Sequence, residues 1–444
     1  MDITIETVLK TLVSDVGARP VGSRANTRTV NYLEQVALEL GYETEMIEFD
    51  CWDWETGGDT GGSEIAIDGI AYPICPGPFS PPVRGVHSVV VVSTAADLDR
   101  LRQKNALLAL RGPIAAEPYM PKDFPFYFPQ GHRRIIEGLE RSEPAAVIAL
   151  TGRHPLCGLD PYPLFEDGAL PFPTAYSAAK GPLAKALEQL VPGTGATIRL
   201  ESHRRRSRSR QLIARRFGTA GIGDNEPGAP ASDVGTYRAA DQSRGLRIVI
   251  TAHMDTKHGT PGALDNACGV SVMVRMMRVL RHAIPAVTLE FVPFNGEEYF
   301  AVPGQLAYLQ SRTPTSDNTV LVVNIDGAGH RESKSAFSLY NADAALEECL
   351  DAVLKDHPVT TCGEQWIAGD HTIFAMAGIP CIAVTSSNLM ETVIGLTHTP
   401  ADTLETIDPK LLERTADCAA ELVRRYTRLA YDSASRAATD ATQT

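Results

Sequence analysis

The stretch LRIVITAHMDTKHGTPGALDNACGVSVMVRMMRVL, residues 246–280, predicts a buried strand, a polar connection and a helix in succession. The run 246–252 is short and rich in β-branched residues, as in strands that are covered on both faces, and a helix is expected over about 263–282. The alternation continues with strands expected at 287–294, 319–325 and 379–385, and helices at about 303–312, 343–356 and 409–430. This order predicts an α/β fold with a mixed, mostly parallel sheet that helices cover on both faces.

Metal-ligand types of side chain follow the places where these strands should end. His253 follows the run 246–252, Glu297 and Glu298 follow VTLEFVPFNG, and Asp326 follows TVLVVNI. Because ligands bind beyond the carboxyl ends of strands in an open α/β sheet, we expect residues distant in sequence to converge there. With Asp265 and His398, the set comprises His253, Asp265, Glu297, Glu298, Asp326 and His398.

Two histidines and four carboxylates have the composition of a site for two divalent cations. Imidazole nitrogens and carboxylate oxygens suit Zn²⁺, with Mn²⁺ or Co²⁺ as alternatives. Two such ions about 3.5–4 Å apart can share a bridging hydroxide and polarise an acyl oxygen, and a remaining carboxylate can transfer the proton. Taken singly, each residue has an ordinary explanation: a structural histidine, a solvated Glu pair, or an aspartate that caps a helix. All six in this order favour a two-metal hydrolase.

The composition indicates a globular protein and argues against nucleic acid as a partner. Of 444 residues 43% are hydrophobic, the formal net charge is −13 and the pI is about 5.4. The N-terminal residues lack the pattern of a signal peptide, and no apolar run has transmembrane length, so no membrane association is expected. Eight cysteines are scattered without a CxxC pair, which is typical of reduced thiols and predicts a cytoplasmic location.

A change in composition near residue 57 indicates an inserted segment, residues 57–205, that is rich in proline. None of the six ligand-type residues falls within it. We therefore expect a catalytic domain over 1–56 and 206–431, interrupted by a smaller β-rich α/β domain over 57–205. The elements expected in the inserted segment are strands at 88–93, 145–150 and 196–200, and helices around 134–141 and 178–190.

Three further stretches complete the chain. The basic run HRRRSRSRQLIARRF, residues 203–217, is compatible with a patch for an anionic ligand or nucleic acid, but the acidic chain favours a solvated return strand. Residues 218–245 predict a long loop. The tail 432–444 is expected to be disordered.

Several blocks of this sequence resemble the motifs of the co-catalytic di-zinc aminopeptidases, the twenty-eighth metallopeptidase family, whose relatives include glutamate carboxypeptidases and glutaminyl cyclases. The blocks occur in the family's order over roughly residues 1–56 and 206–430: GARPVGSRAN, HMDT, GALDNACG, NGEE, NIDGAG, GDHTIFAMAGIP and THTPADTLETID. The resemblance implies the zinc exopeptidase fold. The inserted segment resembles a protease-associated domain, which several members carry at this point.

The resemblance also implies a role for each residue of the set. Asp265 would bridge two Zn²⁺ ions, with His253 and Asp326 completing one site, and Glu298 and His398 the other. Glu297 would be the general acid/base. The remaining implied features are Asp255 placed near enough to orient His253, and a cis peptide bond between Asp265 and Asn266.

Asp370 and His371 are candidates for lining the substrate pocket, because the family block that contains them lies close to the metal site. The alternative is that Asp370 caps the helix predicted at TIFAMAG. Thr397 precedes His398 where some family members have a tyrosine that binds the oxyanion, so no residue is assigned that role.

An aminopeptidase that removes N-terminal residues from peptides is the function most strongly implied. A carboxypeptidase-like enzyme or another small-amide hydrolase would use the same site. A glutaminyl-cyclase-like acyl transferase would work with one zinc ion, and a non-enzymatic binding protein would usually have lost ligands. A peptide or small amide is the expected partner, and homo-oligomer formation is left open.

Overall fold

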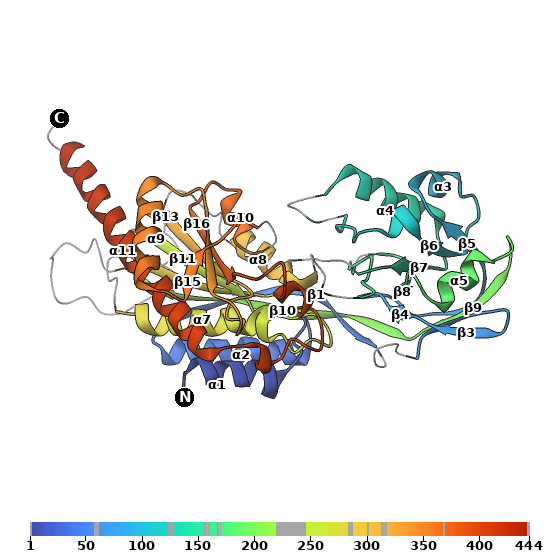
Figure 1. The fold of residues 1–444 in the computed structure, drawn as a ribbon, viewed down its shortest axis with the longest axis horizontal. Helices are drawn as coiled ribbons and strands as arrows, with labels where there is room; N and C mark the ends of the chain where they lie inside the picture. The colour runs from blue at the N-terminus through green and yellow to red at the C-terminus, as the bar shows by residue number, and fades with distance from the viewer. Residues whose placement is uncertain are drawn as a thin grey trace.

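The computed structural model describes residues 2–56, 62–122, 124, 128–153, 158, 160–166, 168, 170–218, 246–282, 287–299, 302–311, 318–366 and 369–441. These residues form two eight-stranded sheets in two lobes (Figure 1). Two long antiparallel strands, β1 (Glu43–Thr56) and β10 (Ser202–Arg216), run from one lobe towards the other. The chain between them builds the second sheet.

The first sheet has the strand order β1-β10-β12-β11-β13-β16-β14-β15. Its central strands β12, β11, β13 and β16 are parallel to one another, and β1 and β10 pair antiparallel. Strand β14 pairs antiparallel with β16 and parallel with β15. The mixed, mostly parallel sheet predicted from the sequence is therefore confirmed. The strands not yet delimited are β11 (Arg247–His253), β12 (Thr288–Phe294), β13 (Thr319–Ile325), β14 (Ser335–Tyr340), β15 (Thr360–Cys362) and β16 (Cys381–Ser386).

Helices cover both faces of this sheet, because successive strand residues point to opposite sides. In β11, Ile248 and Ile250 pack in one core and Val249 packs in the other. The first core holds α1 (Ile5–Lys10), the π-helical turn Thr11–Val16, α2 (Arg24–Glu39), α7 (Cys268–Leu280), α9 (Ala344–Asp356) and α11 (Pro409–Ala441). The second core holds α8 (Pro303–Ser311) and α10 (Thr372–Ala375).

The inserted segment forms the second sheet, in the order β3-β2-β9-β5-β6-β7-β8-β4. Its strands are β2 (Glu64–Ile67), β3 (Ile70–Pro73), β4 (Cys75–Pro76), β5 (Val83–Val92), β6 (Leu107–Leu110), β7 (Ala146–Thr151), β8 (Thr174–Ala178) and β9 (Gly195–Leu200). Helices α3 (Ala95–Arg100), α4 (Gln130–Ser142) and α5 (Pro182–Glu188) pack on it. The domain boundaries themselves stay a prediction.

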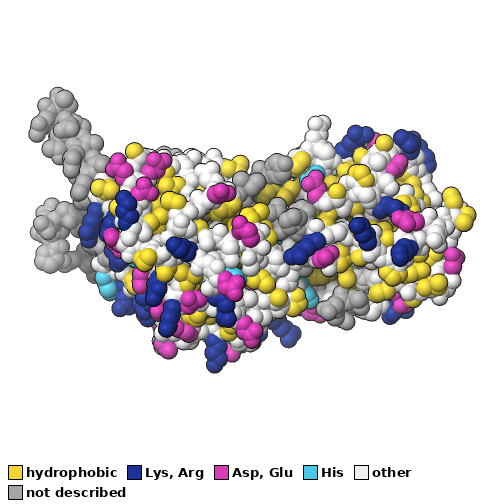
Figure 2. Space-filling model, in the orientation of Figure 1, with side chains coloured by type: hydrophobic (Ala, Val, Ile, Leu, Met, Phe, Trp, Pro, Cys, Tyr) yellow, Lys and Arg dark blue, Asp and Glu magenta, His cyan; other side chains and the backbone are white. Residues whose placement is uncertain are grey.

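The basic run 203–217 forms the return strand β10, and three of its arginines, Arg205, Arg208 and Arg215, pair with acids of β1 or β12. Arg205 contacts Asp53 at 2.5 Å, and Arg215 contacts Glu290 at 2.6 Å. On the face drawn in Figure 2, positive and negative side chains are interspersed along both lobes. No helix of the described residues is both long and apolar enough to cross a bilayer.

Some boundaries differ from the expectations. Helix α2, for which no range was given above, begins at Arg24, because the Ser23 side chain accepts a hydrogen bond from the Asn26 amide and caps it. Helix α11 continues to Ala441, into the tail expected to be disordered, through a stretch rich in alanine, the strongest helix former. Most of the predicted loop 218–245 lies outside the described residues, since only Gly218 belongs to them.

Candidate metal centre

The six ligand-type residues meet at one end of the parallel strands. His253 is the last residue of β11, and Asp326 directly follows the neighbouring strand β13. Glu297 and Glu298 begin a 3-10 turn after β12 on the other side of β11. Neighbouring parallel strands thus bring three sequence-distant segments to one edge of the sheet, as expected.

Asp265 lies between two ligand groups, each with one histidine and one further carboxylate. Its Oδ1 is 3.0 Å from His253 Nε2, and its Oδ2 is 2.9 Å from His398 Nε2. Asp326 Oδ1 lies 3.5 Å from His253 Nε2, and Glu298 Oε2 lies 3.0 Å from His398 Nε2. The structure therefore brings together the two predicted three-residue sets with Asp265 shared between them.

These spacings fit a pair of zinc sites. With ligand bonds of about 2.0–2.2 Å, two donors of a tetrahedral site are about 3.3–3.6 Å apart; the Asp326–His253 distance of 3.5 Å lies in this range, and the other three, at 2.9–3.0 Å, are slightly shorter. Both ring nitrogens of His253 are buried, and neither makes a hydrogen bond with a described residue. An imidazole nitrogen that accepts no hydrogen bond has its lone pair available to bind a metal ion. Each set supplies three ligands and leaves a further position open, as catalytic zinc sites do.

The charges of the site also fit bound cations. Burial alone would lower the pKa of His253, but Asp326, Asp255 and Asp265 raise it well above its ordinary value. Burial would raise the pKa of Asp265, but its contacts with His253 and His398 lower it well below the usual range. Carboxylates concentrated in a buried site repel one another unless positive charge is present, which two divalent ions would supply.

The backbone around Asp265 is held by Asp402, a residue that the sequence analysis did not single out. Asp402 is fully buried, and its carboxylate accepts hydrogen bonds from the amides of Leu264 at 2.6 Å and Asp265 at 3.1 Å. The peptide bond between Asp265 and Asn266 is cis, as the family resemblance implies. The Asn266 side chain donates to the carbonyl of Ile325 at 2.8 Å, which links the Asp265 turn to the end of β13.

Asp255 acts mainly on the Glu297–Glu298 turn. Its carboxylate accepts hydrogen bonds from the amides of Gly296, Glu297 and Glu298 at 2.8, 3.2 and 3.2 Å. Its Oδ1 lies 3.8 Å from His253 Nδ1, beyond hydrogen-bond distance. The predicted orienting contact with His253 is therefore longer than a hydrogen bond, while the anchoring of the turn is direct.

Arg19 fixes the loop between His253 and Asp265 and was also missed by the sequence analysis. The guanidinium is fully buried and donates to the carbonyls of Met254, Pro261 and Gly262 at 2.8, 2.9 and 2.9 Å. Burial lowers the pKa of Arg19 to about 10, against the attraction of Asp255 and other acids. The only signal was its place in the block GARPVGSRAN, which names no partner.

Glu297 is half-buried, and its surroundings favour its protonated form. Removal from water raises the pKa of Glu297 well above its ordinary value; His253 opposes this, while Asp370 and Glu298 add to it. A carboxyl group that retains a proton closer to neutral pH is suited to general acid/base catalysis.

Asp370 and His371 differ in their surroundings. Asp370 accepts a hydrogen bond from Gln305 and does not cap α10, and burial raises its pKa to about 7. His371 packs against the rings of Tyr340 and Trp366, each with its centroid 4.6 Å away. The helix-capping alternative is thus wrong, whereas the predicted role of both residues in substrate binding stays a prediction.

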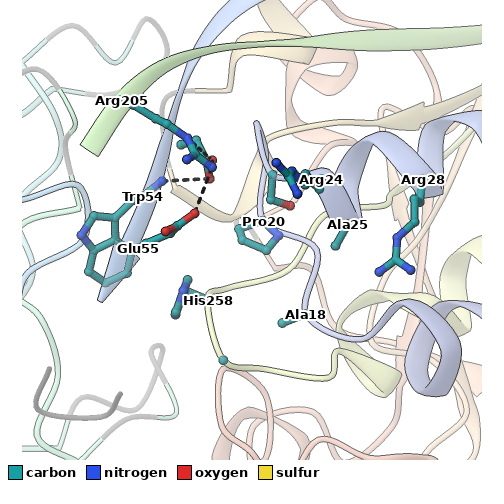
Figure 3. A pocket seen from close by; sticks show the side chains of 12 residues that line it. Ala18, Pro20, Arg24, Ala25, Arg28, Trp54, Glu55, Arg205 and His258 are labelled. Carbon is teal, nitrogen blue, oxygen red and sulfur yellow. Dashed lines mark hydrogen bonds and ion pairs between the residues drawn. The ribbon is translucent and has the colours of Figure 1, made fainter. Parts of the chain in front are cut away.

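A separate pocket of about 630 Å³ opens beside the loop that follows His253 (Figure 3). Pro20, Arg24 and Arg28 form one side of it, and Trp54 and His258 lie on the other. The ring centroids of the Trp54 indole and the His258 imidazole are 4.9 Å apart. No ligand-type residue of the metal centre lines this pocket.

Comparisons with known proteins find peptidases and zinc metalloproteases. A sequence profile of peptidase family M28 matches residues 234–423. Aminopeptidase YwaD of Bacillus subtilis (strain 168) is 28% identical over 182 residues, which are 38% of this chain and 39% of that protein. A probable zinc metalloprotease of Pyrenophora tritici-repentis (strain Pt-1C-BFP) is 31% identical over 27% of this chain and 26% of that protein. The matches thus span less than half of these curated relatives.

Solved structures share the fold over nearly the whole chain. An aminopeptidase from Aneurinibacillus sp. strain AM-1 has a TM-score of 0.71 at 19% identity, over 95% of this chain and 93% of that one. BSAP, a zinc aminopeptidase from Bacillus subtilis, has a TM-score of 0.67 at 18% identity, over 95% and 94%. At these identities the likeness shows the fold, and the sequence profile covers the residues of the metal centre. Over residues 234–423, which include every residue of the metal centre, this chain is similar to peptidase family M28.

Proposed function

We propose that this protein is a zinc aminopeptidase with two Zn²⁺ ions, which removes N-terminal residues from peptides. The observation that carries the proposal is the position of Asp265, whose two carboxylate oxygens each face a different histidine, at 3.0 and 2.9 Å. A bridging carboxylate with one histidine and one acid on each side is a ligand set for two ions. A single-zinc site, as in a cyclase, would not require this duplication.

The residues of this chain divide the chemistry among them. When bound, the two ions would supply a Lewis-acid centre that activates water and polarises the scissile carbonyl. Glu297 would accept a proton as the peptide carbonyl is attacked and return it to the leaving amine. Asp255 holds the backbone of Glu297 in place through its hydrogen bonds to the turn. Asp402 and Arg19 hold the backbone around Asp265 and the loop after His253 in position through their hydrogen bonds.

The preference for a free N-terminal amine is supported by the relatives, which include proteins named as aminopeptidases. Hydrolysis of blocked amides or a carboxypeptidase-like reaction would use the same metal centre and differ only in how the substrate termini are bound. The measurement that separates these reactions is amine release from a panel of aminoacyl-p-nitroanilides, N-acylated analogues and C-terminally blocked peptides. Release confined to substrates with a free amine supports the aminopeptidase.

Glu297→Gln tests the assignment of the acid/base. The amide has the same shape but cannot accept the proton, so we expect kcat to fall by about 10²–10⁴-fold while two zinc ions per chain are retained. Glu347→Gln, an exposed change on α9, is the matched control and should leave both quantities unchanged. Full activity in Glu297→Gln would show that another group moves the proton.

We also propose a cytoplasmic location. Cys268, Cys381 and Cys418 are buried free thiols in the catalytic region, which is typical of proteins kept in a reducing compartment. The distribution of the tagged full-length protein between cell fractions tests this location. Sedimentation of the purified protein would determine whether it forms a homo-oligomer.

A further inference from the structure

Lys257 is a buried cation that contacts the metal ligand Glu298 at two points. Its backbone amide donates to Glu298 Oε1 at 3.2 Å. Its ammonium group donates to the backbone carbonyl of Glu298 and lies 4.6 Å from the ring centroid of Tyr299. Glu298 is therefore held by its carboxylate and by its main chain, and both contacts come from one residue.

The counter-ion of Lys257 comes from the inserted segment. Glu166 Oε2 lies 2.5 Å from Lys257 Nζ, and the two residues are only 5% and 7% exposed. A buried ion pair contributes little net stability, because both charges lose their water, but it restricts where each partner can lie. Loss of Glu166 would leave the Lys257 ammonium without this counter-ion, directly beside Glu298.

The inserted segment also contacts the turn that carries His398. Gly158 has φ +60, and a Cβ atom there would lie 2.1 Å from the carbonyl oxygen of Thr397 and 2.7 Å from that of Ile394. This close approach requires glycine, since no side chain fits between the two backbones. The residue directly before His398 is thus packed against the inserted chain.

We propose that the inserted segment is part of the support of the metal centre: through Glu166 and Gly158 it positions Glu298 and His398, the ligands of one of the two ions. His253 and Asp326 are instead placed by the neighbouring parallel strands β11 and β13. The ion held by Glu298, His398 and Asp265 therefore depends on the inserted segment, and the ion held by His253, Asp326 and Asp265 does not. This inference rests on the two-metal centre proposed above.

Glu166→Gln tests the dependence with little change of shape. Removal of a residue that supports metal ligands lowers metal affinity by about 10–100-fold, so we expect one of the two zinc ions to be lost at a correspondingly lower chelator concentration. Glu188→Gln is the control, because Glu188 is an exposed acid of the same segment that pairs with Arg111 at 2.9 Å. The readout is zinc per chain by elemental analysis, with thermal unfolding of the metal-free proteins recorded alongside.

Combining Glu166→Gln with a second substitution, in one or the other ligand set, identifies which ion is lost. In His253→Ala the remaining ligand set is Asp265, Glu298 and His398, and we expect Glu166→Gln to weaken zinc binding about 10–100-fold there. In His398→Ala the remaining set is His253, Asp265 and Asp326, and the same change should leave affinity within twofold. Equal weakening in both backgrounds would indicate a general structural defect and would overturn the proposal.

Gly158→Ala tests the second contact independently. The added methyl group should displace the turn before His398 and weaken the same ion as Glu166→Gln. Gly112→Ala is matched to it, since Gly112 also lies in the inserted segment with a positive φ, +67, but has no atom within 4 Å of an added Cβ. Two ions per chain with unchanged affinity in both Glu166→Gln and Gly158→Ala would refute the inference and leave the proposed function intact. Absence of bound zinc in the wild-type protein would instead refute the proposed function.

Discussion

The two sheets of this protein have similar topologies but different residues at the ends of their strands. Both have eight strands in a mixed order with a central parallel run. In the first sheet, β11 ends in His253 and β13 is followed by Asp326. In the inserted sheet, the described residues directly after the parallel strands are Ser93, Arg111, Gly152 and Ala179. The comparison shows that the scaffold alone does not make a site, because the chemistry depends on which side chains follow the strands.

The largest expected effect comes from the shared ligand. Asp265→Ala removes a carboxylate from both ligand sets, so we expect loss of both ions and a fall in kcat/KM of at least about 10³-fold, or about 4 kcal/mol in activation free energy. Asp97→Ala in α3 of the inserted segment removes the capping contacts with Ser93 and Thr94 and the contact with Arg100, all far from the metal ligands in sequence, and should leave metal content unchanged. Zinc per chain and amine release are measured for both variants. Retention of one tightly bound ion in Asp265→Ala would show that the two ligand sets are independent.

Metal removal should affect the two sheets unequally. Ions bound only by the folded state stabilise it by mass action, by about 4 kcal/mol at a concentration 1,000-fold above the dissociation constant. After chelation we therefore expect hydrogen exchange to accelerate in β11 and β13, with β6 and β7 changed much less. Comparable acceleration in all four strands would mean that the two sheets share one cooperative unit.

Cavities test the two cores symmetrically, with one buried leucine changed in each core. Leu321 of β13 and Leu139 of α4 are both fully buried, in the catalytic core and in the inserted core respectively. Each change to alanine should cost about 2–5 kcal/mol of unfolding free energy. We expect Leu139→Ala to lower exchange protection in the inserted sheet and Leu321→Ala to lower it in the catalytic sheet. If both variants lost protection in the same strands, the division into two sheets would not correspond to separate folding units.

The periodic part of the chain could be predicted from sequence because its signals are local. Strands β11, β12, β13 and β16 and helices α7, α8 and α9 lie within a few residues of the expected ranges, since each has an apolar run or a helical repeat. Strands β14 and β15 were missed. They are short, and β14 contains serines at two of its six positions, so neither has a clear apolar pattern. Their place at the sheet edge is determined by pairing with β16 and by the packing of α9.

The sequence by itself determined the donor set, because histidines and carboxylates at the ends of apolar strands reflect a local pattern and a known family order. Only the tertiary structure revealed what holds those donors in place. The Arg19 guanidinium reaches Met254 across 235 residues, Asp402 reaches Leu264 across 138, and Glu166 reaches Lys257 across 91. A buried charge acquires its role from the groups that replace its water, and neither composition nor periodicity identifies those groups. The candidate metal ligands could therefore be predicted from the sequence, whereas the residues that position them were identified only in the folded structure.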